Sequence, residues 1–266
     1  MLEIFGYLGA LLMGVTLGLI GGGGSILTLP LLVYIFQIET VLATTYSLFI
    51  VGLTALIGSF SHIKLGNIDA KVAIIFGIPS LISVFATRFY IVPLIPKTLG
   101  FFGSFEVTKS VFILVLLAIL MLLAAYSMLR KSKNIEQIDE AISYNYPLII
   151  VEGLLVGGVT AIVGAGGGFL IIPALVLLTK VPMKKAVGTS LIIIAAKSLI
   201  GFLTDLNLNQ AINWPFLMQF SIVAIVGILI GSQLSKRFNN EKLKPIFAMF
   251  LIVMAIYVIC KELFFK

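Results

Sequence analysis

The sequence has almost none of the residues from which metal centres and catalytic triads are built. Its 266 residues include one cysteine, Cys260, and one histidine, His62. One cysteine excludes an internal disulfide and a cysteine-built metal site, and one histidine excludes a histidine cluster. There is no Ser/His/Asp arrangement, and the stretch GAGGG lacks the lysine and the strand context of a phosphate-binding loop. We therefore expect no enzymatic activity, no catalytic residue, no cofactor and no metal.

Charged side chains are also scarce, at 11% of residues, whereas 60% of residues are hydrophobic and the mean hydropathy is +1.19. Because a soluble domain is about one quarter charged, too few polar side chains remain to cover a surface in water. We expect a multi-pass protein of the cell (inner) membrane, with the lipid bilayer as its surroundings. The net charge of +7 does not indicate nucleic acid, since the basic residues cluster in short segments between apolar runs, as in cytoplasmic loops.

Apolar runs predict an all-α integral membrane protein. The runs are 4–20, 25–36, 41–60, 70–92, 111–129, 148–163, 168–179, 186–203, 215–234 and 246–260. A full helical span needs about 20 residues, so the runs 25–36 and 168–179 are short. We predict a first transmembrane repeat at 1–129, a cytoplasmic linker at 130–147 and a second repeat at 148–266, which together form one transport domain.

The second half of the chain repeats the first. A shift of 143 residues, without a gap, gives 14 identities between residues 21 and 58. Leucine and isoleucine identities are common by chance in such a composition, but the matched glycines, Pro30/Pro173 and Ser47/Ser190 are not. The sequence therefore predicts two repeats of about five helical segments each.

The distribution of lysines predicts that the two repeats are inverted. The segment 61–71 contains two lysines, whereas its counterpart 204–214 contains none; 180–185 contains three, whereas its counterpart 37–40 contains none. The positive-inside rule then gives cytoplasmic segments at 61–71, 130–147, 180–185 and 235–244, and external segments at 37–40, 88–110 and 204–214, with both termini external. The segment 88–110 fits poorly, because it carries Arg88, Lys97 and Lys109. Five crossings per half satisfy this arrangement, and so do three if the runs around each glycine cluster form a re-entrant hairpin.

Glycine clusters interrupt both repeats, at Gly21–Ser25 and Gly164–Gly168. Irregular backbone at membrane depth persists only inside protein or beside water. Helices that restart there would direct unpaired N–H groups and positive dipole ends at one point near the midplane, where an anion binds. The alternative is close helix packing through small residues. The expected backbone contacts to the anion are Gly23, Gly24, Ser25, Gly166, Gly167 and Gly168.

Polar side chains inside the apolar runs would complete such a site. The candidate hydroxyl donors are Thr45, Ser47, Thr189 and Ser190, although each could instead bond back to a helix carbonyl. Lys197 lies in the middle of its run, where a charge is expensive and usually functional. It would attract the anion, or form a structural pair with Glu152 or Asp205. We expect His62, Lys64 and Asp69 to be solvated in a polar connection.

The motifs GGGGSILTLPLL and GAGGGFLIIPALVLL, followed by ATTYSL and AVGTSL, resemble those of the TauE/SafE sulfite-exporter family of membrane permeases. The resemblance implies transport of sulfite, sulfonates, thiosulfate or other small sulfur-containing or organic anions. This sequence departs from the repeat pattern at Tyr46, which replaces the threonine equivalent to Thr189 and would narrow one side of the site.

The sequence thus predicts a permease that moves a small anionic substrate by alternating access, driven by a membrane gradient because no nucleotide site is present. Two other interpretations stay open: a passive anion channel, and a membrane subunit that only anchors a partner. The sequence also leaves open the substrate, the direction of transport, a coupling ion and the formation of a homodimer.

Overall fold

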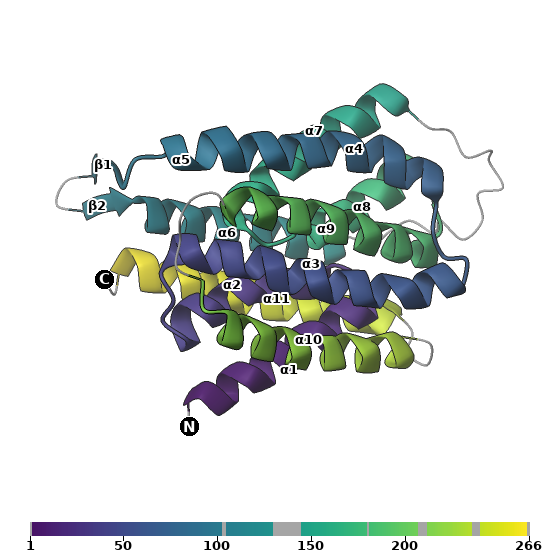
Figure 1. The fold of residues 1–266 in the computed structure, drawn as a ribbon, viewed down its shortest axis with the longest axis horizontal. Coiled ribbons are helices and arrows are strands. Elements are labelled where there is room, and N and C mark those ends of the chain that lie inside the picture. The colour runs from purple at the N-terminus through teal and green to yellow at the C-terminus, as the bar shows by residue number, and fades with distance from the viewer. Residues whose placement is uncertain are drawn as a thin grey trace.

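The computed structural model describes residues 2–102, 105–129, 145–179, 181–206, 212–235 and 240–264. Long helices lie side by side in an elongated bundle, with one small β-hairpin at one end (Figure 1). The first half contains α1 (Leu2–Ile20), the 3-10 helix η1 (Gly23–Leu27), α2 (Thr28–Pro30), the π-helix η2 (Leu31–Ile35), α3 (Thr40–Lys64), α4 (Ala70–Ala86), the π-helix η3 (Thr87–Ile91), α5 (Val92–Leu94), β1 (Thr98–Phe102), β2 (Phe105–Thr108) and α6 (Lys109–Leu129). The second half contains α7 (Tyr146–Val163), α8 (Gly168–Thr179), α9 (Met183–Leu206), α10 (Trp214–Leu234) and α11 (Asn240–Phe264).

Seven helices in the described ranges are long and apolar enough to cross a bilayer. They are Glu3–Ile20, Thr40–Lys64, Ala70–Leu94, Lys109–Leu129, Tyr146–Val163, Lys184–Leu206 and Trp214–Leu234. Ile74, Ile78 and Ile82, spaced four residues apart on α4, are each more than half exposed, as expected for a helix face in contact with lipid. The prediction of a helical membrane protein with many spans is confirmed.

The β-hairpin is the one departure from an all-α fold among the described residues. Strands β1 and β2 pair antiparallel, with Thr98 opposite Thr108. Their sequences, TLGFF and FEVT, are rich in the β-branched and aromatic residues that favour strands. The hairpin makes the connection between α5 and α6 longer than the one between α10 and α11.

Polar residues at the ends of the apolar runs fix where several helices begin. In the described part of the chain, four helices have an N-cap side chain that accepts a hydrogen bond from the backbone N–H three residues later, which satisfies one unpaired donor of the first turn. The caps are Glu39 for α3, Asp69 for α4, Asn145 for α7 and Asn213 for α10. Asp69 is thus a helix cap rather than a simply solvated side chain.

Small residues let the long helices pack closely. Helix α1 packs along α10, and α7 packs along α4; α3 packs against α9, and α6 against α11. A Cβ atom on Gly14 of α1 would clash with the carbonyl oxygen of Ala224 in α10. A Cβ atom on Gly157 of α7 would lie 2.6 Å from the carbonyl oxygen of Ser80 in α4. Such backbone contacts are typical of membrane helices, in which van der Waals packing replaces the hydrophobic drive between helices.

The segments that follow the two glycine clusters are too short to cross a membrane. The apolar helical stretch Gly24–Ile35 and helix α8 each have 12 residues, or about 18 Å at 1.5 Å per residue. The hydrocarbon core is about 30 Å thick. Each segment on its own is therefore too short to span the core, as the re-entrant alternative requires.

Candidate anion-binding site

The two glycine clusters form tight left-handed turns in the backbone. The angle φ is +83° at Gly21, +70° at Gly164, +64° at Gly166 and +72° at Gly167. Side chains with a Cβ atom rarely adopt this region, whereas glycine does so at little steric cost. These turns end α1 and α7, and they allow new helical segments to begin at Gly23 and Gly168.

The two breaks touch each other in the buried interior of the protein. A Cβ atom on Gly168 would lie 2.5 Å from Gly22 Cα, and a Cβ atom on Gly22 would clash with the Gly168 carbonyl group. Each break also packs on the long helix of the opposite half. A Cβ atom on Gly164 would lie 2.6 Å from Thr44 Cβ in α3, and one on Gly21 would clash with Val187 in α9. The glycines therefore provide both special turns and close packing.

Lys197 lies against the second break, inside the protein. Its side chain is 1% exposed, and its Nζ donates a hydrogen bond to Thr160 Oγ1 at 2.8 Å. A Cβ atom on Gly167 would lie 2.7 Å from Nζ, so the ammonium group is in contact with the turn that precedes α8. No carboxylate of the described residues lies within 4.0 Å of Nζ, which leaves the expected pairs with Glu152 and Asp205 unformed.

The electrostatics at the start of α8 are positive. The N–H groups of Leu170 and Ile171 donate to Gly167 O, so those of Gly168 and Phe169 precede the first bonds of the ladder. The helix dipole adds partial positive charge at this end. An ammonium group beside it raises the potential further in a low-dielectric interior. The arrangement attracts an anion and costs energy when none is bound.

Ser198 is a further candidate site residue, which the sequence analysis did not predict. Its Oγ lies 3.2 Å from the position of a Cβ on Gly166, and it has no hydrogen-bond partner within the described structure. The repeat gave no signal, because the counterpart of Ser198 is Ala55. Ser47, in α3, is also fully buried, and its Oγ has no hydrogen-bond partner among the described atoms. Both hydroxyls retain a donor for a ligand.

Two other predicted serines form local hydrogen bonds. Ser25 Oγ donates to Gly22 O at 2.8 Å, within the first break. Ser190 Oγ donates to Val187 O at 2.8 Å, with a longer contact of 3.4 Å to Gly21 O. Ser190 therefore lies at the first break, while Gly24 packs against α1, where a Cβ atom would lie 2.6 Å from Leu17 N.

Thr189 and Tyr46 hold the beginnings of two helices. Thr189 Oγ1 accepts a hydrogen bond from Asp69 N at 2.9 Å, at the start of α4. The Tyr46 hydroxyl accepts one from Asn213 N at 2.6 Å, at the start of α10. Each hydroxyl therefore accepts a hydrogen bond from the backbone N–H of a helix N-cap residue. The longer tyrosine side chain makes in the first half the contact that threonine makes in the second.

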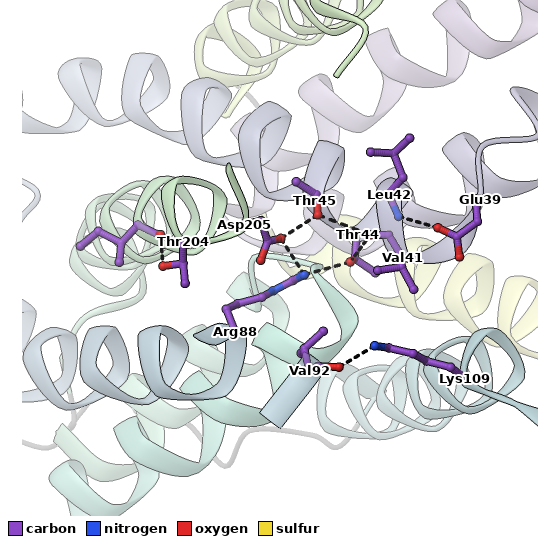
Figure 2. A network of polar contacts seen from close by, with 11 residues as sticks. Glu39, Val41, Leu42, Thr44, Thr45, Arg88, Val92, Lys109, Thr204 and Asp205 are labelled. Carbon is purple, nitrogen blue, oxygen red and sulfur yellow. Dashed lines mark hydrogen bonds and ion pairs between the residues drawn. The ribbon is translucent and has the colours of Figure 1, made fainter. Parts of the chain in front are cut away.

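A buried ion pair joins η3 to α9, in two stretches where the sequence predicted connecting segments (Figure 2). Arg88 NH1 donates to Asp205 Oδ2 at 2.9 Å and to Thr44 Oγ1 at 3.0 Å, and Thr45 Oγ1 donates to the same Asp205 oxygen at 2.6 Å. The prediction that Arg88 and Asp205 lie in connecting segments is wrong, because η3 and α9 extend over them and both side chains are buried. His62 is likewise buried in the last turns of α3 rather than solvated. Arg88 and Asp205 were misplaced because a charged residue was taken to end a helix, whereas these two are paired inside the protein.

Comparison with known proteins supports transport. The sequence profile of the family described as "Sulfite exporter TauE/SafE" matches residues 7–258. A probable membrane transporter protein of Xylella fastidiosa is 30% identical, over 94% of this chain and 92% of its own length. Probable membrane transporter proteins of Methanocaldococcus jannaschii (27% identical; 93% and 92%) and of Bacillus subtilis, YunE (26% identical; 96% of each), are also similar. No solved structure matches the chain.

Proposed function

Since the chain belongs to the TauE/SafE sulfite exporter family, whose relatives are named as membrane transporters rather than enzymes, we propose that it carries a small oxyanion across the cytoplasmic membrane. The substrate class is sulfite, a sulfonate or thiosulfate, and the chain works by gradient-driven alternating access. One observation supports this most strongly: the buried Lys197 ammonium lies against Gly167, where the second break meets the first, without a carboxylate partner in the described residues.

The site offers an oxyanion several donors at once. The Lys197 ammonium has three N–H bonds, of which one is used for Thr160. The first N–H groups of α8, those of Gly168 and Phe169, lie at this turn, and the hydroxyl of Ser198 lies beside Gly166 in the same turn. Charge-assisted bonds of this kind are about twice as strong as neutral ones, and the oxygens of a sulfur oxyanion accept several of them.

The pattern of helix contacts supports two structural repeats, which the distribution of lysines predicts to be inverted. The shift of 143 residues relates α1 to α7, α3 to α9 and α4 to α10. The contact of α1 with α10 is therefore equivalent to the contact of α7 with α4. Helices α3 and α9 are counterparts of each other, and they pack together. Gly14 and Gly157, one shift apart, make the equivalent close contacts in the first two pairs. In each half, a helix thus packs on a helix of the other half. Two repeats that pack in this way suit a rocking motion about a central site.

The positions of the chain ends agree with an odd number of crossings per half. Both ends of the chain lie at one end of the bundle, and the connection between α3 and α4 lies at the other (Figure 1). We place the end that carries Lys64, Lys71, Lys184 and Lys185 in the cytoplasm, with both termini external. The segment 88–110 fits the positive-inside rule poorly because it carries three cations. Arg88 is buried inside the bundle, so only Lys97 and Lys109 count against the external placement.

Counterflow in proteoliposomes tests the proposed function. The full chain is reconstituted alone, loaded inside with unlabelled sulfite, thiosulfate or methanesulfonate, and given the labelled compound outside. A carrier accumulates label transiently, because its inward and outward steps are coupled through one site. Flux without acceleration by internal substrate would identify a passive channel. Absence of flux with all three compounds would favour a subunit that only anchors a partner.

A further inference from the structure

Arg88 presents an unused pair of hydrogen-bond donors in the interior. Its side chain is 1% exposed, and NH1 makes the bonds to Asp205 and Thr44. The Nε and NH2 atoms have no hydrogen-bond partner in the part of the chain that the structure describes. These two atoms form the edge of the guanidinium that binds two oxygens of a carboxylate, phosphate or sulfur oxyanion side by side. Leaving such donors buried and unpaired costs free energy.

The ion pair with Asp205 is also incomplete on the acidic side. The contact uses Asp205 Oδ2, which Thr45 shares, while Oδ1 has no partner in the described residues. Had the pair evolved for stability alone, a two-oxygen contact would satisfy more of these atoms. The one-oxygen contact fixes the end of the guanidinium and leaves its Nε–NH2 edge available.

Arg88 is one contact away from the second glycine break. Its NH1 bonds to Thr44 Oγ1, and Thr44 packs directly on Gly164. Lys197 touches Gly167, at the other end of the same short turn. Arg88 also lies in the π-helix η3, a type of turn that is frequent at functional sites. Two buried cations therefore approach the turn at 164–167 from α4–η3 and from α9.

We infer that Arg88 is a second anion-binding residue of the transport site, and that its Nε–NH2 edge binds two oxygens of the substrate. The inference rests on the proposed function, which needs only the glycine breaks and Lys197. Asp205 holds Arg88 through NH1 and competes with the anion for its charge. Lys197 supplies a point charge, whereas Arg88 supplies planar geometry, so Arg88 selects for substrates with at least two oxygens on one atom.

Calorimetric titration of sulfite and methanesulfonate into the full chain in nanodiscs tests this role. Arg88→Lys keeps the charge but loses the paired donors, so we expect affinity to fall about tenfold or more, the value of a charged hydrogen bond. Asp205→Asn removes the competing charge, so affinity should rise. The control is Lys109→Gln, which removes one positive charge near the same network (Figure 2); its Nζ bonds to the carbonyl of Val92, and its affinity should match the wild type.

The double variant Arg88→Gln/Asp205→Asn separates binding from structure. It replaces the ion pair with a neutral pair of similar shape, so a purely structural pair would give wild-type affinity once the fold is retained. An anion-binding Arg88 predicts weak binding in the double variant despite a retained melting temperature. Wild-type affinity in Arg88→Lys or in the double variant would overturn the inference about Arg88. If Lys197→Met still loses anion affinity in that case, the proposed function stands without Arg88. Absence of anion binding by the wild type would instead overturn the proposed function.

Discussion

Lys197 Nζ and Thr160 Oγ1 are hydrogen-bonded at 2.8 Å inside the protein, where α9 crosses the end of α7. The threonine hydroxyl in turn donates to Val156 O at 2.6 Å, so its lone pairs are directed to the ammonium group. A neutral hydroxyl orients the lysine without neutralising it. The repeat partner of Lys197, Thr54, instead bonds to its own helix at Ile50 O. The positive charge is thus placed at one break only.

Replacing Lys197 with methionine should reduce anion binding without destabilising the protein. The change keeps a long side chain in the same space and removes a buried charge that has no described carboxylate partner, which is costly to hold. We expect the dissociation constant for sulfite to rise about tenfold or more, with a melting temperature no lower than that of the wild type. Titration calorimetry and thermal unfolding in the same detergent measure both. Unchanged affinity would assign Lys197 to structure alone.

Replacing Gly168 with alanine should separate the two breaks. The new Cβ would lie 2.5 Å from Gly22 Cα, which is backbone and cannot move independently. We therefore expect loss of flux in proteoliposomes. Gly77→Ala is the matched control, because its Cβ would meet Ile193 Cγ1 at an ordinary 3.7 Å. Equal flux in both variants would show that the contact between the breaks does not matter for transport.

Replacing Tyr46 with phenylalanine should loosen the start of α10. The change removes the acceptor of the 2.6 Å bond from Asn213 N and should cost about 1 kcal/mol of stability. Thermal unfolding measures the shift, and Tyr90→Phe, at an exposed tyrosine, should show none. If Tyr46 serves only to hold α10, sulfite affinity stays at the wild-type value in titration calorimetry. A large loss of affinity with no loss of stability would place its hydroxyl in the anion path instead.

Cysteine labelling in intact cells tests the proposed orientation. Cys260→Ser removes the one native cysteine, and single cysteines are then introduced as Lys97→Cys or Lys64→Cys at exposed positions. A membrane-impermeant maleimide should label position 97, which we place outside, and should reach position 64 only after the cells are opened. The opposite pattern would reverse the orientation and place both termini in the cytoplasm.

The fold was largely predictable because the membrane restricts it. A span must be long, apolar and helical, so the runs and the repeat were visible in composition and spacing alone. The glycine turns were predictable for a related reason, since a cluster such as Gly21–Gly24 destabilises a helix unless a special backbone is required. The hairpin β1–β2 was not, because four or five residues of alternating character give too weak a pattern within an apolar chain.

Side-chain partners were less predictable than backbone. The pairing of Arg88 with Asp205 joins residues 117 positions apart, and no local pattern encodes such a contact. The ends of the helices were misplaced for the same reason, since a charge ends an apolar run only when nothing in the interior pairs with it. Ser198 could not be predicted from the repeat, because its counterpart in the first half is Ala55, which has no hydroxyl group.

The two glycine breaks and Lys197 are proposed to form one anion site. A cryo-electron microscopy map of the full chain in nanodiscs with saturating thiosulfate tests it most directly. We predict density for the anion between Gly22 and Gly167, with an oxygen within about 3 Å of Lys197 Nζ and with the contact between Gly22 and Gly168 loosened. Anion density remote from both breaks, with Lys197 still bonded to Thr160 and the glycines still in contact, would show that the anion binds elsewhere.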